Sequence, residues 1–454
     1  MSQQLDYFKP LALPNTTVVG EQAFAGDLLG REKLAKQLTG YLDRLQVGAV
    51  LAIDARWGEG KTWFGLNWAK YLESDEHEHK VVFIDAFAQD YIEDPFLLIA
   101  AEIMDLLDDE TGSVKELREK AASVMQAILP VTTKALINFA GRVVLGSSGL
   151  SEDIQDAVKG AGEDTADATS KWVEKKLEEH GHEKESLANF RAALAKFAAA
   201  QDKPVIIFID ELDRCRPTFA VQLIERIKHF FDVPNLVFVL LLNREQLEKA
   251  IKGIYGAETD AATYLGKFVH LFLRLPKNAM SNIASHDRRE SMFIKDVVKR
   301  YGFNDSPTVL VNGFEEELSQ WADSANMSLR DIERACALFV MANVSNIGIT
   351  IYLIVLKLKH HALYERLVRN DKSAHQAAID LLLPLINEKK PAEMSWRDYY
   401  FRCLKELHEL YLGLLPEGAP YLKEYGGPLF GFGNLNVKSI FFNAFNRIDL
   451  PVEN

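Results

Sequence analysis

A glycine-bearing turn followed by lysine and threonine could hold a polyphosphate in this chain. Gly58 and Gly60 come after an apolar run at 50–53, and Lys61-Thr62 opens a helical pattern over 63–72. Glycine lets a backbone approach phosphate oxygens, and the N–H groups of a helix N-terminus attract anions. Lys61 would reach the β- and γ-phosphates, and the Thr62 hydroxyl would bind Mg²⁺. The residues expected to contact the nucleotide are Arg56, Trp57, Gly58, Glu59, Gly60, Lys61, Thr62 and Trp63.

Two adjacent carboxylates could complete this chemistry. Asp210 and Glu211 end a continuous apolar run at 205–209, and such a run is typical of a parallel strand buried on both faces. At the carboxyl end of that strand, Asp210 would hold Mg²⁺ through water, and Glu211 would orient or deprotonate the attacking water. An ordinary solvated turn is the alternative interpretation. Together with Lys61, the pair predicts a Mg²⁺-dependent ATPase with ATP and Mg²⁺ as its ligands.

One position departs from the phosphate motif and another has two interpretations. The motif asks for glycine at its first position, and this chain has Ala55 there. Alanine disfavours a positive φ, but the Gly-Lys-Thr end carries the phosphate chemistry, so we expect the change to be tolerated. Another apolar run, at 236–242, ends in Asn243. Asn243 could position the lytic water, or it could cap a helix over 244–254, and both roles are compatible.

The composition narrows the class of protein. The 454 residues allow two or three domains, and 48% hydrophobic with 26% charged residues is typical of a globular protein. The net charge of −13 disfavours nucleic acid as a partner. The three cysteines lie far apart, as expected of reduced thiols in the cytoplasm, and the first residues lack the pattern of a secretory leader.

The order of these patterns predicts four regions. We expect an N-terminal arm at 1–25, a nucleotide-binding domain at 26–276, a helical lid domain at 277–412, and a tail rich in Gly, Pro and Phe at 413–454. The lid domain is expected to contain one long helix from about 347 to 369. Before the phosphate loop, the segment Gly26-Asp-Leu-Leu-Gly-Arg-Glu32 opens a helix that runs to about Leu45; this segment either lies against an adenine base or merely caps that helix.

A long interruption at about 108–185 separates the two phosphate-site motifs. A structureless loop of this length is uncommon in a compact domain, so we expect a helical insertion. Its first half is apolar, but a membrane span needs about 20 consecutive apolar residues, and Pro130, Lys134 and Arg142 interrupt the stretch. We therefore expect packing on the core or on a partner, with peripheral membrane association as a minor alternative. The aromatic residues of the tail are expected to pack on the protein's own helices rather than on a partner.

Several segments closely resemble the KAP family of P-loop NTPases. They are the run at 206–215, the helix at 224–232, Tyr-Leu-Gly-Lys at 264–267 and Leu-Arg-Leu-Pro at 273–276, and Trp57-Gly58 matches the tryptophan-glycine phosphate loop of the family. Many members carry transmembrane helices in the insertion between Walker A and Walker B, whereas this insertion departs from that pattern. Members usually have aspartate where this chain has Glu211 and Asn243, which moves the site toward the AAA-like pattern.

The resemblance implies a fold and further site residues. The fold is an α/β P-loop NTPase core of the additional-strand, catalytic-glutamate (ASCE) class, in which helices flank a central five-stranded parallel sheet and an all-helical C-terminal domain follows. The segment 327–334 resembles an AAA-like lid helix, in which Arg330 would touch the γ-phosphate. The alternative is that Arg330 and Arg334 pair with Asp331 and Glu333 on a solvated face. Whether Arg214 or Lys267 acts on a neighbouring subunit is left open.

Three functions remain open at the level of the sequence. The first is an ATPase whose turnover drives assembly or conformational change in a multi-protein system. The resemblance implies a homo-oligomer or partner proteins of a defence-type operon, because bacterial relatives often belong to anti-phage or plasmid-exclusion modules. The second is a nucleotide-gated scaffold or switch with little turnover, for which Ala55 leaves room. The third, a nucleic-acid-dependent motor, is disfavoured by the net charge.

Overall fold

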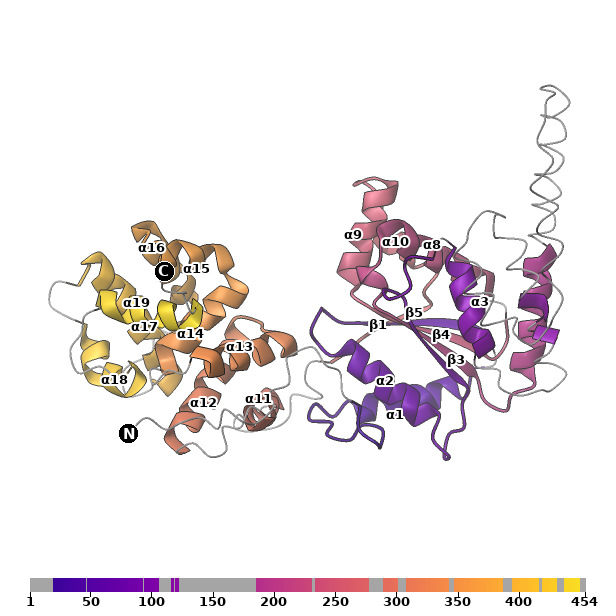
Figure 1. The fold of residues 1–454 in the computed structure, drawn as a ribbon, viewed down its shortest axis with the longest axis horizontal. Coiled ribbons are helices and arrows are strands. Elements are labelled where there is room, and N and C mark those ends of the chain that lie inside the picture. Colours follow the sequence, from indigo (N-terminus) through magenta and orange to yellow (C-terminus); the bar gives the residue numbers. More distant parts are fainter. Residues whose placement is uncertain are drawn as a thin grey trace, which may run out of the picture.

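The protein is built from an α/β domain followed by a helical domain (Figure 1). The computed structural model describes residues 19–45, 47–92, 94–105, 116–117, 119–121, 185–230, 233–276, 289–300, 308–342, 347–386, 394–415, 419–430 and 437–449. The expected N-terminal arm and the expected insertion therefore lie almost wholly outside the described residues.

Five parallel strands form the sheet of the α/β domain, as the family resemblance implied. They are β1 (Ala49–Asp54), β2 (Val81–Asp85), β3 (Val205–Asp210), β4 (Leu236–Leu242) and β5 (Leu271–Arg274). Their spatial order is β2-β3-β4-β1-β5, and every neighbouring pair is parallel. β4 thus lies between the strand that precedes the phosphate loop and the strand that ends in the acid pair. This is the arrangement of the additional-strand class.

Alternate residues of each strand enter two separate cores, one on each face of the sheet. On one face, Ile206, Phe208 and Val237 pack with α1 (Glu32–Leu42) and α2 (Lys61–Leu72). On the other face, Ile207 and Phe238 pack with α3 (Pro95–Asp105), α8 (Pro217–Ile227), α9 (Arg244–Tyr255) and α10 (Ala261–Leu265). Figure 1 shows the two groups of helices on opposite sides of the sheet. Every residue of β3 and β4 is buried, which explains their continuous apolar sequences.

The helical domain has a core of its own around α14. Its helices are α11 (Arg289–Arg300), α12 (Thr308–Ser324), α13 (Leu329–Ala342), α14 (Ile347–Lys359), α15 (His361–Val368), α16 (Lys372–Leu382), α17 (Trp396–Leu412), α18 (Pro420–Phe430) and α19 (Val437–Asp449). All residues from Gly348 to Leu356 are buried. Within the described part of the chain, none of the helices is both long and apolar enough to cross a membrane.

The prediction of one long helix at 347–369 is wrong. The chain breaks at His360, whose φ of −133° and ψ of 50° separate α14 from α15. α14 is buried on nearly all sides, whereas α15 buries only Tyr364 and Leu367. The break turns that narrower apolar face toward the same core. The sequence has neither glycine nor proline at this point, so the break follows from tertiary packing and carries no local signal.

Part of the Gly-, Pro- and Phe-rich tail is helical. α19 packs Phe441 and Phe445 into the core of the helical domain, and Phe442 is 62% exposed. The aromatic side chains at 430 and 432 lie outside the residues whose side chains are described.

Two buried histidines join a tyrosine inside the helical domain. The Tyr352 hydroxyl lies 2.8 Å from His408 Nε2, and His408 Nδ1 lies 2.8 Å from His375 Nδ1. Burial lowers the pKa of His375 to about 4, although the charge of Asp371 acts in the opposite direction. Burial and the neighbouring His375 lower the pKa of His408 well below its ordinary value. Both imidazoles are therefore neutral in the folded protein near neutral pH.

This pair is expected to make the helical domain less stable in mild acid. At a pH below the ordinary histidine pKa of about 6.5, these histidines bind protons in the unfolded chain but stay neutral in the folded chain. The free energy of unfolding should therefore fall as the pH drops from about 6.5 toward 4. Urea unfolding at pH 7, 6 and 5 measures this slope, and His375→Asn should make it shallower. An equal slope in both proteins would show that the pair does not cause the effect.

Candidate nucleotide site

The loop between β1 and α2, residues 55–60, has the backbone of a phosphate-binding turn. Gly58 and Gly60 have φ values of +79° and +78°, which only glycine adopts without strain. Ala55 is not among the described non-glycine residues with positive φ, and it is 3% exposed. The departure from the motif at Ala55 therefore brings no backbone strain, because this position does not need a positive φ. The methyl group of Ala55 packs into the core.

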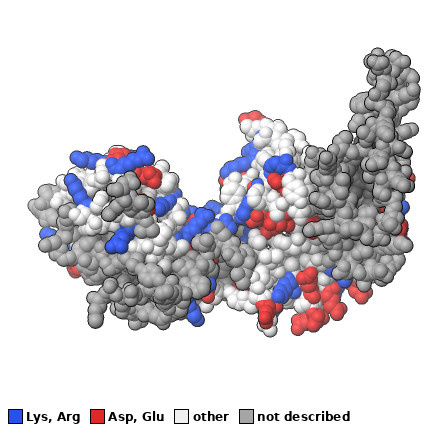
Figure 2. Space-filling view, viewed as in Figure 1, with Lys and Arg blue, Asp and Glu red and all other residues white. Residues whose placement is uncertain are grey.

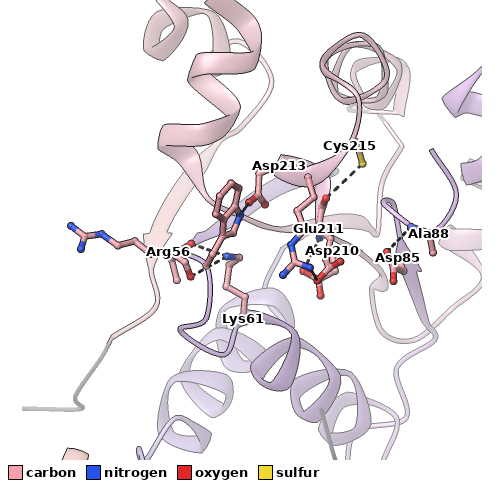
Figure 3. Close-up of polar contacts among 11 residues, drawn as sticks. Arg56, Lys61, Asp85, Ala88, Asp210, Glu211, Asp213 and Cys215 are labelled. Carbon is pink, nitrogen blue, oxygen red and sulfur yellow. Dashed lines mark hydrogen bonds and ion pairs between the residues drawn. The ribbon is translucent and has the colours of Figure 1, made fainter. Parts of the chain in front are cut away.

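Lys61 and Thr62 open α2, and Figure 3 shows Lys61 on the side of the helix N-terminus where the acids at the end of β3 lie. The Lys61 Nζ donates hydrogen bonds to the carbonyls of Ala55 (2.8 Å) and Arg56 (3.3 Å). Burial lowers the pKa of Lys61, and the charges of Asp213 and Asp210 raise it. Burial raises the pKa of the Asp210 carboxylate, and the Thr62 side chain acts in the opposite direction. Residues from both motifs thus meet at one place above the carboxyl ends of β1 and β3.

The acid pair combines a buried carboxylate with a strained glutamate. Asp210 is 1% exposed, and its Oδ1 accepts the Glu211 N–H at 2.8 Å. Burial raises the pKa of Asp210. Glu211 has φ 58° and ψ 22°, a conformation that costs a non-glycine residue about 1–3 kcal/mol and is found mainly at functional sites. Glu211 Oε1 lies 2.8 Å from Arg214 Nη1; burial raises the pKa of Glu211, and Arg214 offsets part of that rise.

Three other residues of the expected nucleotide set have structural contacts. The Trp57 indole Nε1–H donates to Asp213 Oδ2 and so joins the phosphate loop to the turn after the acid pair. The Glu59 carboxylate accepts the backbone N–H of Arg56 at 3.0 Å, while the Arg56 side chain is exposed and points away from the acids (Figure 3). The Trp63 ring packs edge-on against Phe24, with a centroid distance of 5.8 Å. Trp63 therefore supports the core beneath the loop.

Asn243 lies at the carboxyl end of β4, between the phosphate loop and the acid pair. It is 7% exposed, and its Oδ1 accepts the Gln246 N–H at 3.4 Å, which caps α9. The strand order places the same side chain beside both halves of the site. The structure thus shows the capping contact and leaves the position suitable for orienting a water molecule.

The N-terminus of α13 rests directly on the tip of the phosphate loop. The Arg330 N–H donates to the Gly58 carbonyl at 3.2 Å. Burial lowers the pKa of Arg330, and the charges of Arg214 and Arg334 lower it further. The charge of Glu211 acts in the opposite direction. In Figure 2, Lys and Arg side chains gather where the two domains approach each other, beside acidic side chains of the α/β domain.

The acids that could have paired with Arg330 and Arg334 on a solvated face have other contacts. Asp331 exchanges hydrogen bonds with Ser328 as a capping box and also binds Lys359 at 3.0 Å. Glu333 lies 3.2 Å from Arg300. Glu333 also raises the pKa of Arg330 by its charge, and contact of Arg330 with the γ-phosphate stays a prediction.

Gly58→Ala is expected to destabilise the protein and separate α13 from the loop. A Cβ at this position would lie 2.7 Å from the Arg330 Cβ and 2.8 Å from the Ser328 Oγ, at a φ of +79°. The backbone strain alone should cost about 1 kcal/mol, and the overlap should raise the total to about 2–3 kcal/mol. Gly26→Ala is the matched control, because Gly26 also has positive φ (+75°) but open space around it. Thermal unfolding of both variants measures the difference, and equal losses would contradict the predicted contact.

A comparison with family models supplies the decisive observation. Residues 31–344, well over half of the chain, match the KAP family P-loop domain. The chain belongs to the KAP family. The match begins at Arg31, beside the phosphate loop, and extends through α13, so it includes both motifs and the segment that carries Arg330.

Other comparisons are weaker. The phage T7 exclusion protein of Escherichia coli strain K12 is 22% identical to this KAP protein over 109 residues, which make up 24% of this chain and 15% of that protein. The chain thus spans only a small part of that relative. Two structures of the Aeropyrum pernix ORC2 protein, in ADPNP–ADP complexes and in the ADP form, align over 96% of this chain. The two alignments include 97% and 96% of the ORC2 chains, with TM-scores of 0.33 and 0.34 and sequence identities of 11% and 12%.

Proposed function

We propose that this protein binds MgATP at the site between β1 and β3 and hydrolyses it. Turnover would drive assembly or conformational change in a multi-protein system. The observation that carries the proposal is the strand order: β1, which leads into Lys61 and Thr62, and β3, which ends in Asp210, lie on either side of β4 and run parallel to it, so both motifs reach the same edge of the sheet. A lysine, a hydroxyl and a carboxylate from distant parts of the chain together suit a metal-bound triphosphate.

The residues present fit a bound Mg²⁺. Mg²⁺ prefers oxygen ligands and is usually held by one or two protein side chains, waters and substrate phosphates. The Thr62 hydroxyl and the Asp210 carboxylate supply oxygens of this kind, and Asp210 is 1% exposed with its pKa raised by burial. These two residues would hold the ion directly or through water. When bound, Mg²⁺ would neutralise charge on the phosphate oxygens.

The remaining residues have separate roles in the proposed reaction. Lys61 would exchange its hydrogen bonds to the loop carbonyls for the β- and γ-phosphates. Glu211 would orient or deprotonate the attacking water, and Asn243 would help to position that water. Arg330 would contact the γ-phosphate and transmit its presence through α13, whose N-terminus touches Gly58.

One observation favours a second candidate, a nucleotide-gated switch with little turnover. Arg214 holds the Glu211 carboxylate at 2.8 Å, and a carboxylate bound in this way is a weaker base. As long as the ion pair persists with nucleotide bound, water activation would be slow. The protein would then report nucleotide occupancy mainly through conformation.

We place this activity in the cytoplasm, in a defence-type system with partner proteins or further copies of the chain. Support comes from KAP family membership and from the similarity to a phage exclusion protein. A pull-down from the native host with and without ATP tests this part. Partners captured only with ATP would support it, and an identical set of proteins in both conditions would count against nucleotide-driven assembly.

Calorimetry and phosphate release test the nucleotide chemistry. We expect wild-type protein to bind ATP with an affinity that falls when Mg²⁺ is chelated, and to release phosphate in steady state. Titration with GTP measures base preference. Binding without release would select the switch, and stimulation by DNA or RNA would select a nucleic-acid-dependent motor. Failure to bind either nucleotide would refute the assignment of the site.

A further inference from the structure

Arg31 contacts the phosphate loop from behind. It precedes α1, is 2% exposed, and directs its guanidinium at backbone carbonyls. Nη2 donates to the Glu59 carbonyl at 2.7 Å, and Nη1 donates to the Gly60 carbonyl at 3.2 Å. A longer contact of 3.5 Å joins Nη2 to the carbonyl of Pro276, just after β5. One buried side chain thus holds two successive peptide groups of the loop.

The geometry of the peptide bond gives these contacts a consequence for ligand binding. A trans peptide is planar, so its carbonyl and its N–H point in opposite directions. The Glu59 carbonyl shares a peptide with the Gly60 N–H, and the Gly60 carbonyl shares one with the Lys61 N–H. The Gly60 carbonyl also accepts the Phe64 N–H at 3.1 Å, in the first turn of α2. The Lys61 N–H therefore points out of the helix N-terminus, where such groups have no intrahelical partner.

The charge of Arg31 is suited to an anion on the opposite side of the loop. Burial lowers the pKa of Arg31 to about 10, and the charges of Asp27 and Glu59 raise it. The groups of the loop that its guanidinium contacts are neutral carbonyls, and these hydrogen bonds do not cancel its positive charge. A phosphate bound on the far side of Gly60 would interact favourably with this cation. The fit is close, because a Cβ at Gly60 would lie 2.8 Å from Arg31 Nη1.

We propose that Arg31 is a positioning residue for the phosphate loop. Its guanidinium holds the carbonyls of Glu59 and Gly60, so that the N–H groups of Gly60 and Lys61 face the nucleotide phosphates. The inference rests on the proposed function of the site. The guanidinium contacts the loop carbonyls.

Replacing Arg31 tests the proposal through nucleotide affinity. Arg31→Ala should raise the dissociation constants of MgATP and MgADP by about tenfold or more, because two hydrogen bonds from a charged donor no longer orient the loop. Arg31→Lys should give an intermediate loss, since an ammonium keeps the charge but lacks the planar fork that spans both carbonyls. KM should rise more than kcat falls. Arg44→Ala is the control, because the exposed Arg44 side chain donates to the Gly40 carbonyl beside the other end of α1, away from the phosphate loop, and its affinities should match wild type.

The outcomes separate positioning from a purely structural role. Calorimetry and thermal unfolding are run on the same preparations of the full chain. A lower melting temperature for Arg31→Ala with both dissociation constants within twofold of wild type would overturn the proposal. If Arg31→Ala does not fold, Arg31→Lys carries the test, and unchanged affinities in that variant would overturn it equally. If wild-type protein binds neither nucleotide, the proposed function of the site fails, and this inference fails with it.

Discussion

Glu211→Gln is expected to bind MgATP with near-normal affinity and to release phosphate about 10²–10⁴ times more slowly than wild type. Glutamine keeps the shape of the side chain but cannot accept a proton from water. Asp210, Thr62 and Lys61 remain, so the groups that hold the triphosphate are intact. Equilibrium binding and steady-state phosphate release, measured on the same preparation, check both halves of this prediction.

The fold should tolerate this substitution. Glu211 already has a positive φ of 58°, and glutamine meets the same backbone strain, so thermal stability should change little. The ion pair with Arg214 at 2.8 Å is lost, but a neutral hydrogen bond to the amide oxygen can replace it. Glu365→Gln is the control, because Glu365 is a half-exposed carboxylate on α15. Normal turnover by Glu211→Gln would remove Glu211 from water activation, and equally slow release by wild type and variant would favour the switch.

The sequence was sufficient to predict the sheet and the two halves of the site. Strands β1, β3 and β4 are buried on both faces and appear as apolar runs that end in polar residues. Parallel strands place their carboxyl ends at one edge, so Lys61, Asp210 and Asn243 could be assigned to a common place. The intervening position of β4 came from the resemblance to a known class, because a single sequence does not give strand order.

The contacts that fix the site were not visible in the sequence. Arg31 reaches carbonyls of the loop, Trp57 reaches Asp213, and the start of α13 rests on Gly58. Each joins residues separated by many positions, and each depends on how two elements pack. Only the segment 26–32, which contains Arg31, gave a signal, and that signal left contact with adenine and simple helix capping equally open. Ala55 shows the reverse case, since a departure from the motif brings no backbone strain once its backbone conformation is known.

Lys61→Ala is expected to weaken MgATP binding by at least about 10–100-fold, which corresponds to the loss of one or two hydrogen bonds from a charged donor. The Lys61 Nζ contacts the carbonyls of Ala55 and Arg56. These neutral acceptors are released more readily than a carboxylate, so the ammonium can move to the phosphates at small cost. The substitution also removes the positive charge of Lys61, which interacts favourably with the charges of Asp210 and Asp213. The triphosphate would then meet acids whose repulsion Lys61 no longer offsets.

The same substitution distinguishes ligand binding from folding. Lys61 is 9% exposed, so a loss of stability could imitate a loss of affinity. Lys70→Ala is the matched control, because Lys70 lies on the same helix and its exposed side chain donates to the Gly20 carbonyl. Thermal unfolding without nucleotide should show that Lys61→Ala still folds, and added MgATP should raise the melting temperature of wild type and Lys70→Ala but not of Lys61→Ala. An equal rise in melting temperature in all three proteins would mean that the nucleotide binds elsewhere, because the affinity of a triphosphate for this loop depends on the charge of Lys61.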